Sequence, residues 1–191
     1  MKPKLVDKNY ILDHLSAGIY LFTSLTLSPL NSVLADILKQ YPQAKTLCFN
    51  ILPYELNLSN PMGNIEESRR FYTGSEIINT IRKFGKTENA KFVIINSYLL
   101  LDAQEKWFLN NLLDLACKYN LSVIVLETVP VYKPHPFPKK SKIKKLLPHP
   151  YNYSNKVYYI LPTGNYGIDF QNPNDQDYEV RVYKWRKFSC K

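Results

Sequence analysis

Four short apolar runs, separated by stretches with helical periodicity, most constrain the fold of this chain. The runs cover residues 18–23, 46–51, 91–97 and 122–127, and each is rich in β-branched or aromatic residues. Runs of this length without polar alternation are typical of strands that are buried on both faces of a parallel sheet. Strands that alternate with helices form βαβ units. The sequence therefore predicts an α/β fold with helices on both faces of a mostly parallel central sheet.

Three stretches between these runs have apolar residues at helical spacing. They cover residues 29–40, 75–84 and 102–119. Ser28 and Pro29 supply an N-cap and a first-turn residue for the first helix, and Ser75 is the N-cap predicted for the second. In the third helix we expect Trp107 and Phe108 to pack in the core or against the sheet.

The pattern changes after residue 130. Residues 132–151 are rich in Pro and Lys and lack regular periodicity, so they predict a loop, as residues 52–63 also do. Residues 156–162 and 178–188 are two further strands, which predict a C-terminal β-hairpin at the edge of the sheet. A chain of 191 residues fits one domain. We therefore expect a single domain over residues 1–191 that contains the basic loop 132–151.

The formal net charge of +9 favours an acidic partner, nucleic acid before a membrane surface. The alternative is a lysine-rich composition without a binding partner. No run of about 18 apolar residues exists, and residues 1–10 lack the apolar region of a signal peptide, so a cytoplasmic protein without membrane contact is expected. The wide spacing of Cys48, Cys117 and Cys190 indicates reduced thiols. No cluster has metal-ligand spacing, so neither a metal nor another cofactor is expected.

Three segments carry a family resemblance. The eight residues 24–31 join the first predicted strand to its helix, and their sequence is Ser-Leu-Thr-Leu-Ser-Pro-Leu-Asn. Asn96 directly follows the apolar strand residues 92–95, and Lys184 and Arg186 form a Lys-x-Arg pair on the last predicted strand. Together with the order of elements, these segments resemble the RecA-like ATPase core, and within it the helicase domain of the DnaB type. The resemblance covers roughly residues 10–188.

The resemblance places residues 24–31 at the phosphate-binding loop GxxxxGK[ST]. The spacing fits, but both glycines are absent, starting with Ser24 at the first of them, so the loop cannot easily turn its N–H groups around a phosphate. Leu30 occupies the position of the Lys, Asn31 that of the Mg²⁺-binding hydroxyl, and Pro29 removes one N–H donor. The resemblance thus implies a degenerate nucleotide site.

The carboxylates of that family are also replaced. Asn96 stands where the family has a metal-binding Asp, and it keeps the shape of the side chain without the charge. The second strand ends at Asn50 and Ile51 without the expected Glu, and Glu55 is not expected to act as a base. Hydrolysis of ATP is therefore not expected.

The basic loop is the strongest candidate for a binding site. It corresponds to a nucleic-acid-facing loop in the resembled family, and its lysines can neutralise phosphates while aromatic residues stack on bases. Phe137 and Tyr151 are interspersed with them. The predicted nucleic-acid-binding residues are Tyr132, Lys133, Lys139, Lys140, Lys142, Lys144 and Lys145. The alternative is a solvated basic loop without a partner.

Lys184 and Arg186 are a second, smaller candidate. In the resembled helicases a Lys-x-Arg pair reaches the ATP of the neighbouring subunit, and a spacing of two on a strand puts both side chains on one face. The pair therefore predicts a subunit interface. The alternative is an exposed strand face with alternating basic residues.

The leading hypothesis is a non-catalytic RecA-like protein in DNA replication or recombination. It binds nucleic acid, DNA before RNA, and associates with itself or with an active ATPase. One alternative is a protein-interaction module whose basic loop meets an acidic protein surface. Another is an enzyme with a rebuilt site at the carboxyl ends of the strands, where Asn50, Asn96 and Glu127 could gather.

Overall fold

The computed structural model describes the chain in eight stretches, and all structural statements below concern them. They are residues 4–6, 8–24, 28–50, 64–69, 73–96, 105–128, 148–162 and 178–185. In chain order the elements are β1 (Lys4–Val6), α1 (Lys8–Leu12), β2 (Gly18–Ser24), α2 (Ser28–Gln40), β3 (Lys45–Asn50), β4 (Ile65–Arg69), α3 (Gly74–Phe84), β5 (Ala90–Asn96), α4 (Glu105–Tyr119), β6 (Ser122–Thr128), α6 (Pro148–Tyr153), β7 (Lys156–Pro162) and β8 (Tyr178–Trp185).

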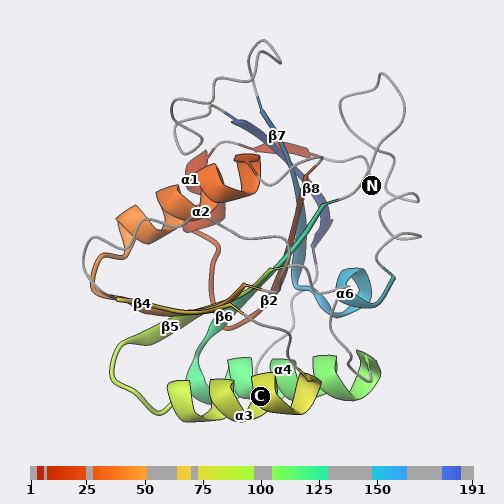
Figure 1. Cartoon of the computed structure of the whole chain (residues 1–191). Coiled ribbons are helices and arrows are strands. Elements are labelled where there is room, and N and C mark those ends of the chain that lie inside the picture. The colour runs from red at the N-terminus through yellow and green to blue at the C-terminus, as the bar shows by residue number, and fades with distance from the viewer. Residues whose placement is uncertain are drawn as a thin grey trace.

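One sheet of eight strands runs through the molecule in the order β1-β8-β7-β2-β6-β5-β3-β4 (Figure 1). The neighbours from β7 to β4 are parallel, while β7 with β8 and β8 with β1 are antiparallel. The mostly parallel α/β sheet with a C-terminal hairpin is therefore confirmed. The short strand β1 extends the sheet beyond that hairpin.

Helices cover both faces of the sheet. Figure 1 shows α1 and α2 on one face, and α3 and α4 on the other. Alternate residues of β2 enter the two cores, because successive side chains of a strand point to opposite faces. Ile19 and Leu21 belong to the core beneath α3 and α4, whereas Tyr20 and Phe22 belong to the core beneath α2. This two-sided burial explains the continuous apolar runs in the sequence.

A capping box starts α3. The Thr73 Oγ1 accepts a hydrogen bond from the Glu76 backbone N–H at 3.3 Å, and the Glu76 carboxylate accepts one from the Thr73 N–H at 2.9 Å. The N-cap is therefore Thr73, and the predicted Ser75 is wrong. Both residues suit a cap, but only Thr73 has a Glu three positions later, so only Thr73 satisfies two N–H groups at once.

Gly18 begins β2 with a φ of +146°, a conformation that side chains with a Cβ rarely adopt. A Cβ at this position would lie 2.5 Å from the Asn155 Nδ2. Asn155 in turn joins β2 to the start of β7, since its backbone N–H donates to the Ile19 carbonyl at 2.6 Å and its Oδ1 accepts from the Ile19 N–H at 3.3 Å. The close approach of Asn155 therefore requires glycine here.

Three further expectations differ from the structure. Residues 65–69 form the edge strand β4, although their charged sequence predicts a solvated run. The predicted loop 132–151 ends in a helix, because α6 begins at Pro148. Trp107 is 44% exposed, so it lies outside the core that buries Phe108. The predicted loop 52–63 lies outside the described ranges.

The cysteines also differ from expectation. Cys117 on α4 is disulfide-bonded, so the prediction of reduced thiols is wrong for this residue. Cys48 is a buried thiol in the core beneath α2. Of the helices in the described stretches, none is long and apolar enough to cross a membrane.

Candidate functional site

The junction between β2 and α2 lies at the carboxyl edge of the parallel strands. β2 ends at Ser24 and α2 begins at Ser28, and the residues between them lie outside the described ranges. Thr23 and Ser24 are fully buried. Their hydroxyl groups have no hydrogen-bond partner among the residues that the structure describes, and neither does the Oδ1 of Asn31 in the first turn of α2. The junction thus concentrates buried polar atoms where a helix N-terminus meets the sheet.

Leu30 lies in this first turn but belongs to the core. Its side chain is fully buried and joins the cluster beneath α2 together with Val33 and Leu34. Pro29 beside it is also buried. A side chain packed in this way contributes nothing to the binding of a ligand at the edge of the sheet, and it supplies no charge.

Two amide side chains meet at the ends of β3 and β5. Asn50 and Asn96 are direct register partners, both are buried, and the Asn96 Nδ2 donates to the Asn50 Oδ1 at 3.3 Å. Sequence reasoning placed both residues at this edge, and the structure brings them together. The pair is neutral, so it offers amide dipoles where a pair of carboxylates would offer ligands for a divalent cation.

Glu127 ends β6 beside these residues but on the other face of the sheet. It is the register partner of Thr23, and it follows the alternation of Val123 and Val125, which enter the core beneath α4. Asn96 follows the alternation of Ile94, which enters the core beneath α2. The structure thus joins Asn50 to Asn96 and places the buried Glu127 with Thr23 across the sheet, so the three polar residues do not form one cluster.

The basic candidates are placed only in part. Lys184 lies on β8 opposite Val157. Arg186 and the predicted nucleic-acid-binding residues from Tyr132 to Lys145 lie outside the described ranges. Tyr151 has a defined place, and it differs from the expected stacking role. Its ring is only 3% exposed and packs in the core beneath α3 and α4, so it cannot stack on a base.

Sequence reasoning missed two features of the site. One is the pair of buried hydroxyl groups at Thr23 and Ser24, although two polar residues at the end of an apolar strand are a signal of a polar site. The other is a hollow at the amino edge of the sheet, lined by four helix-to-strand turns. The available signal was Asn at the turn positions 89 and 120.

Comparison with known proteins supports the fold. No protein-family model matches the chain, and no curated protein sequence matches it. A solved structure of the ATPase domain of a DnaB-family protein matches with a TM-score of 0.66 at 12% sequence identity, over 89% of this chain and 78% of that one. It is one of 245 matching chains, and a fold shared so widely does not specify a function. The chain therefore has a RecA-like fold, as its sequence predicted.

Proposed function

We propose that this chain is a RecA-like protein that does not hydrolyse ATP, and that it binds nucleic acid, DNA in preference to RNA. It acts as a scaffold for an active ATPase or for further copies of itself in DNA replication or recombination. The observation that carries the first part is the chemistry of the carboxyl edge, where Leu30 packs in the core and Asn50 pairs with Asn96.

Hydrolysis of a nucleoside triphosphate requires positive charge on the phosphates and a carboxylate that holds the metal. The buried Leu30 supplies no cation in the first turn of α2. The Asn50–Asn96 pair supplies no negative charge on its face of the sheet. A helix N-terminus remains, and its partial charge is a weak attraction for anions compared with a lysine and a bound metal.

The nucleic-acid part of the proposal rests on charge. The chain carries a net charge of +9, and six of its lysines fall between positions 133 and 145. Lysines at this density neutralise adjacent phosphates and release counterions, which favours binding at low salt. Lys184 and Arg186 remain the candidates for contact with a neighbouring subunit.

The test is a titration of labelled single- and double-stranded DNA by fluorescence anisotropy at two salt concentrations, with and without ATP. The wild type is compared with a variant in which the five loop lysines Lys139, Lys140, Lys142, Lys144 and Lys145 are changed to Ala. We expect the loop variant to bind at least about tenfold more weakly and the salt slope to fall by about 4. ATP should change neither value.

A matched control removes the same charge elsewhere. Its five changes to Ala are at lysines that are exposed in the structure: Lys39, Lys45, Lys83, Lys86 and Lys118. We expect this variant to keep most of the affinity. Equal weakening of both variants, or unchanged affinity of the loop variant, would contradict the binding role of the loop. Steady release of phosphate from ATP by the wild type would contradict the first part of the proposal.

A further inference from the structure

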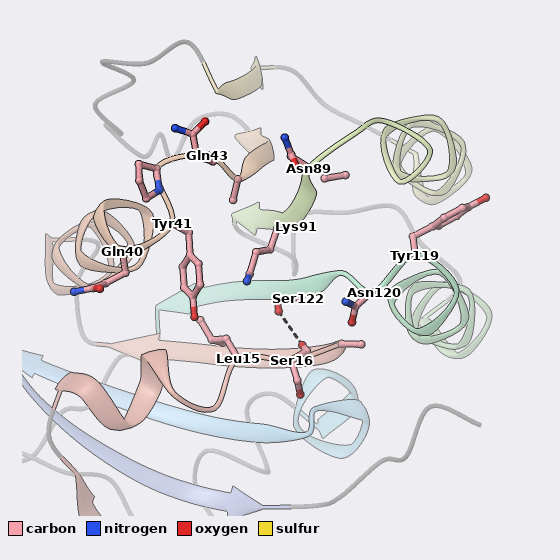
Figure 2. A pocket seen from close by; sticks show the side chains of 14 residues that line it. Leu15, Ser16, Gln40, Tyr41, Gln43, Asn89, Lys91, Tyr119, Asn120 and Ser122 are labelled. Atoms are coloured by element: carbon pink, nitrogen blue, oxygen red, sulfur yellow. Dashed lines mark hydrogen bonds between the residues drawn. The ribbon is translucent and has the colours of Figure 1, made fainter.

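The largest hollow at the amino edge of the sheet has a volume of about 490 Å³. Four turns line it, at residues 15–17, 40–44, 89–91 and 119–122, and each leads from a helix into a parallel strand. Figure 2 shows these turns converging around the first residues of the strands. The hollow is therefore at the opposite edge of the sheet from Asn50 and Asn96, and its volume lies in the range of small-molecule sites.

The lining is polar and carries a single charged side chain, that of Lys91. Its amide side chains belong to Gln40, Gln43, Asn89 and Asn120, and no carboxylate is among the described residues that line it. None of these four amide groups has a hydrogen bond within the described part of the chain, so each can still donate and accept one. The lining thus suits a ligand with a negative group and with uncharged polar groups around it.

Lys91 is held in place by aromatic rings. Its Nζ lies 3.9 Å from the centre of the Tyr41 ring and 5.7 Å from that of Phe92, and the two rings themselves are in contact at 5.3 Å. Figure 2 shows the ammonium group reaching into the space between Tyr41 and Ser122. No carboxylate in the described ranges pairs with this ammonium. A cation whose stem is fixed in this way loses little freedom when it binds an anion.

Two turn residues have a backbone conformation that asparagine adopts more readily than most residues. Asn89 has a φ of +60° and Asn120 a φ of +54°. Asn120 directly follows α4, and the turn is closed by the Leu121 N–H, which donates to the Ala116 carbonyl at 2.8 Å. The left-handed conformation fixes where the side chain of Asn120 leaves the backbone, and Figure 2 shows this side chain beside Ser122 at the rim.

The ends of the surrounding helices do not exclude an anion. The carboxyl ends of α2 and α3 carry a partial negative charge toward this edge. Lys39 and Lys83, in the last turns of these helices, offset it. Asp13 lies in a smaller adjoining hollow that shares Leu15, Gln40 and Tyr41 with the main one, and it does not line the space around Lys91.

We propose that this hollow binds a small phosphate monoester of the size of a sugar phosphate or a nucleoside monophosphate. The phosphate is held by the Lys91 ammonium, which acts as a compact point charge. The hydroxyl groups or base edge of the ligand are held by the amides of Asn120, Asn89 and Gln40. The volume greatly exceeds that of a phosphate ion, which is why an ester is favoured over free phosphate. This site is independent of the proposed binding of nucleic acid by the loop.

The test is two-dimensional NMR titration of the labelled chain with ribose 5-phosphate, AMP, ribose, adenosine and inorganic phosphate. We expect saturable shifts for both esters at the amides of Lys91, Asn120 and Ser122. Inorganic phosphate and the two uncharged compounds should bind at least about tenfold more weakly, because each lacks one half of the interaction. Equal affinity for free phosphate and for the esters, or no saturable shift, would overturn the proposal.

Matched variants separate the site from general charge. Lys91→Met keeps the stem on Tyr41 and should weaken both esters about tenfold or more, whereas Lys91→Arg should retain binding. Lys118→Met is the control, since Lys118 also lies over a tyrosine, Tyr119 at 5.5 Å, but does not line the hollow. Asn120→Gly removes an amide without backbone strain and should weaken binding about threefold.

Two results with these variants would overturn the assignment. One is equal weakening by Lys118→Met and Lys91→Met, which would indicate only nonspecific attraction. The other is a set of shifts at Asn50 and Asn96 in place of the amino edge, which would locate the ester at the opposite side of the sheet. Loss of DNA binding on removal of the loop lysines would leave all of these expectations unchanged.

Discussion

Gly18 shows how one residue can determine the junction of two strands. Its φ of +146° and the Asn155 side chain beside it leave no place for a Cβ. We expect Gly18→Ala to lower the free energy of unfolding by about 3 kcal/mol, since backbone strain costs about 1–3 kcal/mol and displacement of Asn155 breaks a buried hydrogen bond worth about 1 kcal/mol. Urea denaturation followed by circular dichroism measures this change.

A double-mutant cycle with Asn155→Ala divides the loss into its parts. If the clash contributes, Gly18→Ala should cost less in the Asn155→Ala background than in the wild type. A loss below about 0.5 kcal/mol in the wild-type background would show that the strand start tolerates a side chain, and it would contradict the structural role given to Gly18.

At the scale of single elements, the sequence predicts most of the regular structure. Strands such as β5 and β6 are predictable because a strand buried on both faces must be apolar throughout, which leaves a clear signal. β4 is not, because an edge strand needs only backbone hydrogen bonds to one neighbour, here β3, and its residues Ile65 to Arg69 can stay polar. Tertiary pairing, and not local preference, makes these five residues a strand.

The cap of α3 provides a test at this scale. Thr73→Ala removes the side-chain acceptor of the Glu76 N–H and should lower the free energy of unfolding by about 1 kcal/mol. Ser75→Ala is the control, because Ser75 is exposed and lies in the first turn past the cap. Chemical denaturation of both variants measures the difference. A cost at Ser75 equal to that at Thr73 would assign the cap to the wrong residue.

For the whole molecule, the candidate sites follow the two edges of the parallel strands. The ends of β3 and β5 were predictable, so Asn50 and Asn96 could be placed side by side from the sequence. The hollow around Lys91 could not, because its four turns lie far apart in the sequence and only the strand order β2-β6-β5-β3 brings them together. Strand order depends on packing between distant segments, to which local patterns are blind.

The stability of the whole fold should depend on pH through Lys156. This residue is 5% exposed at the start of β7, with its Nζ 4.9 Å from the Tyr10 ring, and burial lowers the pKa of its ammonium from 10.5 to about 8. Between about pH 8 and 10 the unfolded chain therefore holds a proton that the folded chain has lost. Stability should rise with pH in that window, by about 2 kcal/mol.

Guanidinium denaturation between about pH 7 and 10 measures this dependence. The rise should be absent in Lys156→Met, in which no ammonium titrates. Above about pH 10 stability should fall again in both proteins, because burial raises the pKa of Tyr183 to about 12 and the unfolded chain then ionises first. A flat profile for the wild type across the window would show that the Lys156 ammonium remains hydrated.

The pairing of β1 with β8 also determines when the sheet can be completed during synthesis. Lys4 lies opposite Val182, so the first strand waits for nearly the whole chain to leave the ribosome. At about 5–20 residues per second this delay is on the order of ten to forty seconds. The fully apolar β2 has the same difficulty, since its neighbours β6 and β7 begin at Ser122 and Lys156. A nascent chain that ends before Ser122 thus exposes a strand that only later segments can cover, and such a chain is a substrate for chaperones.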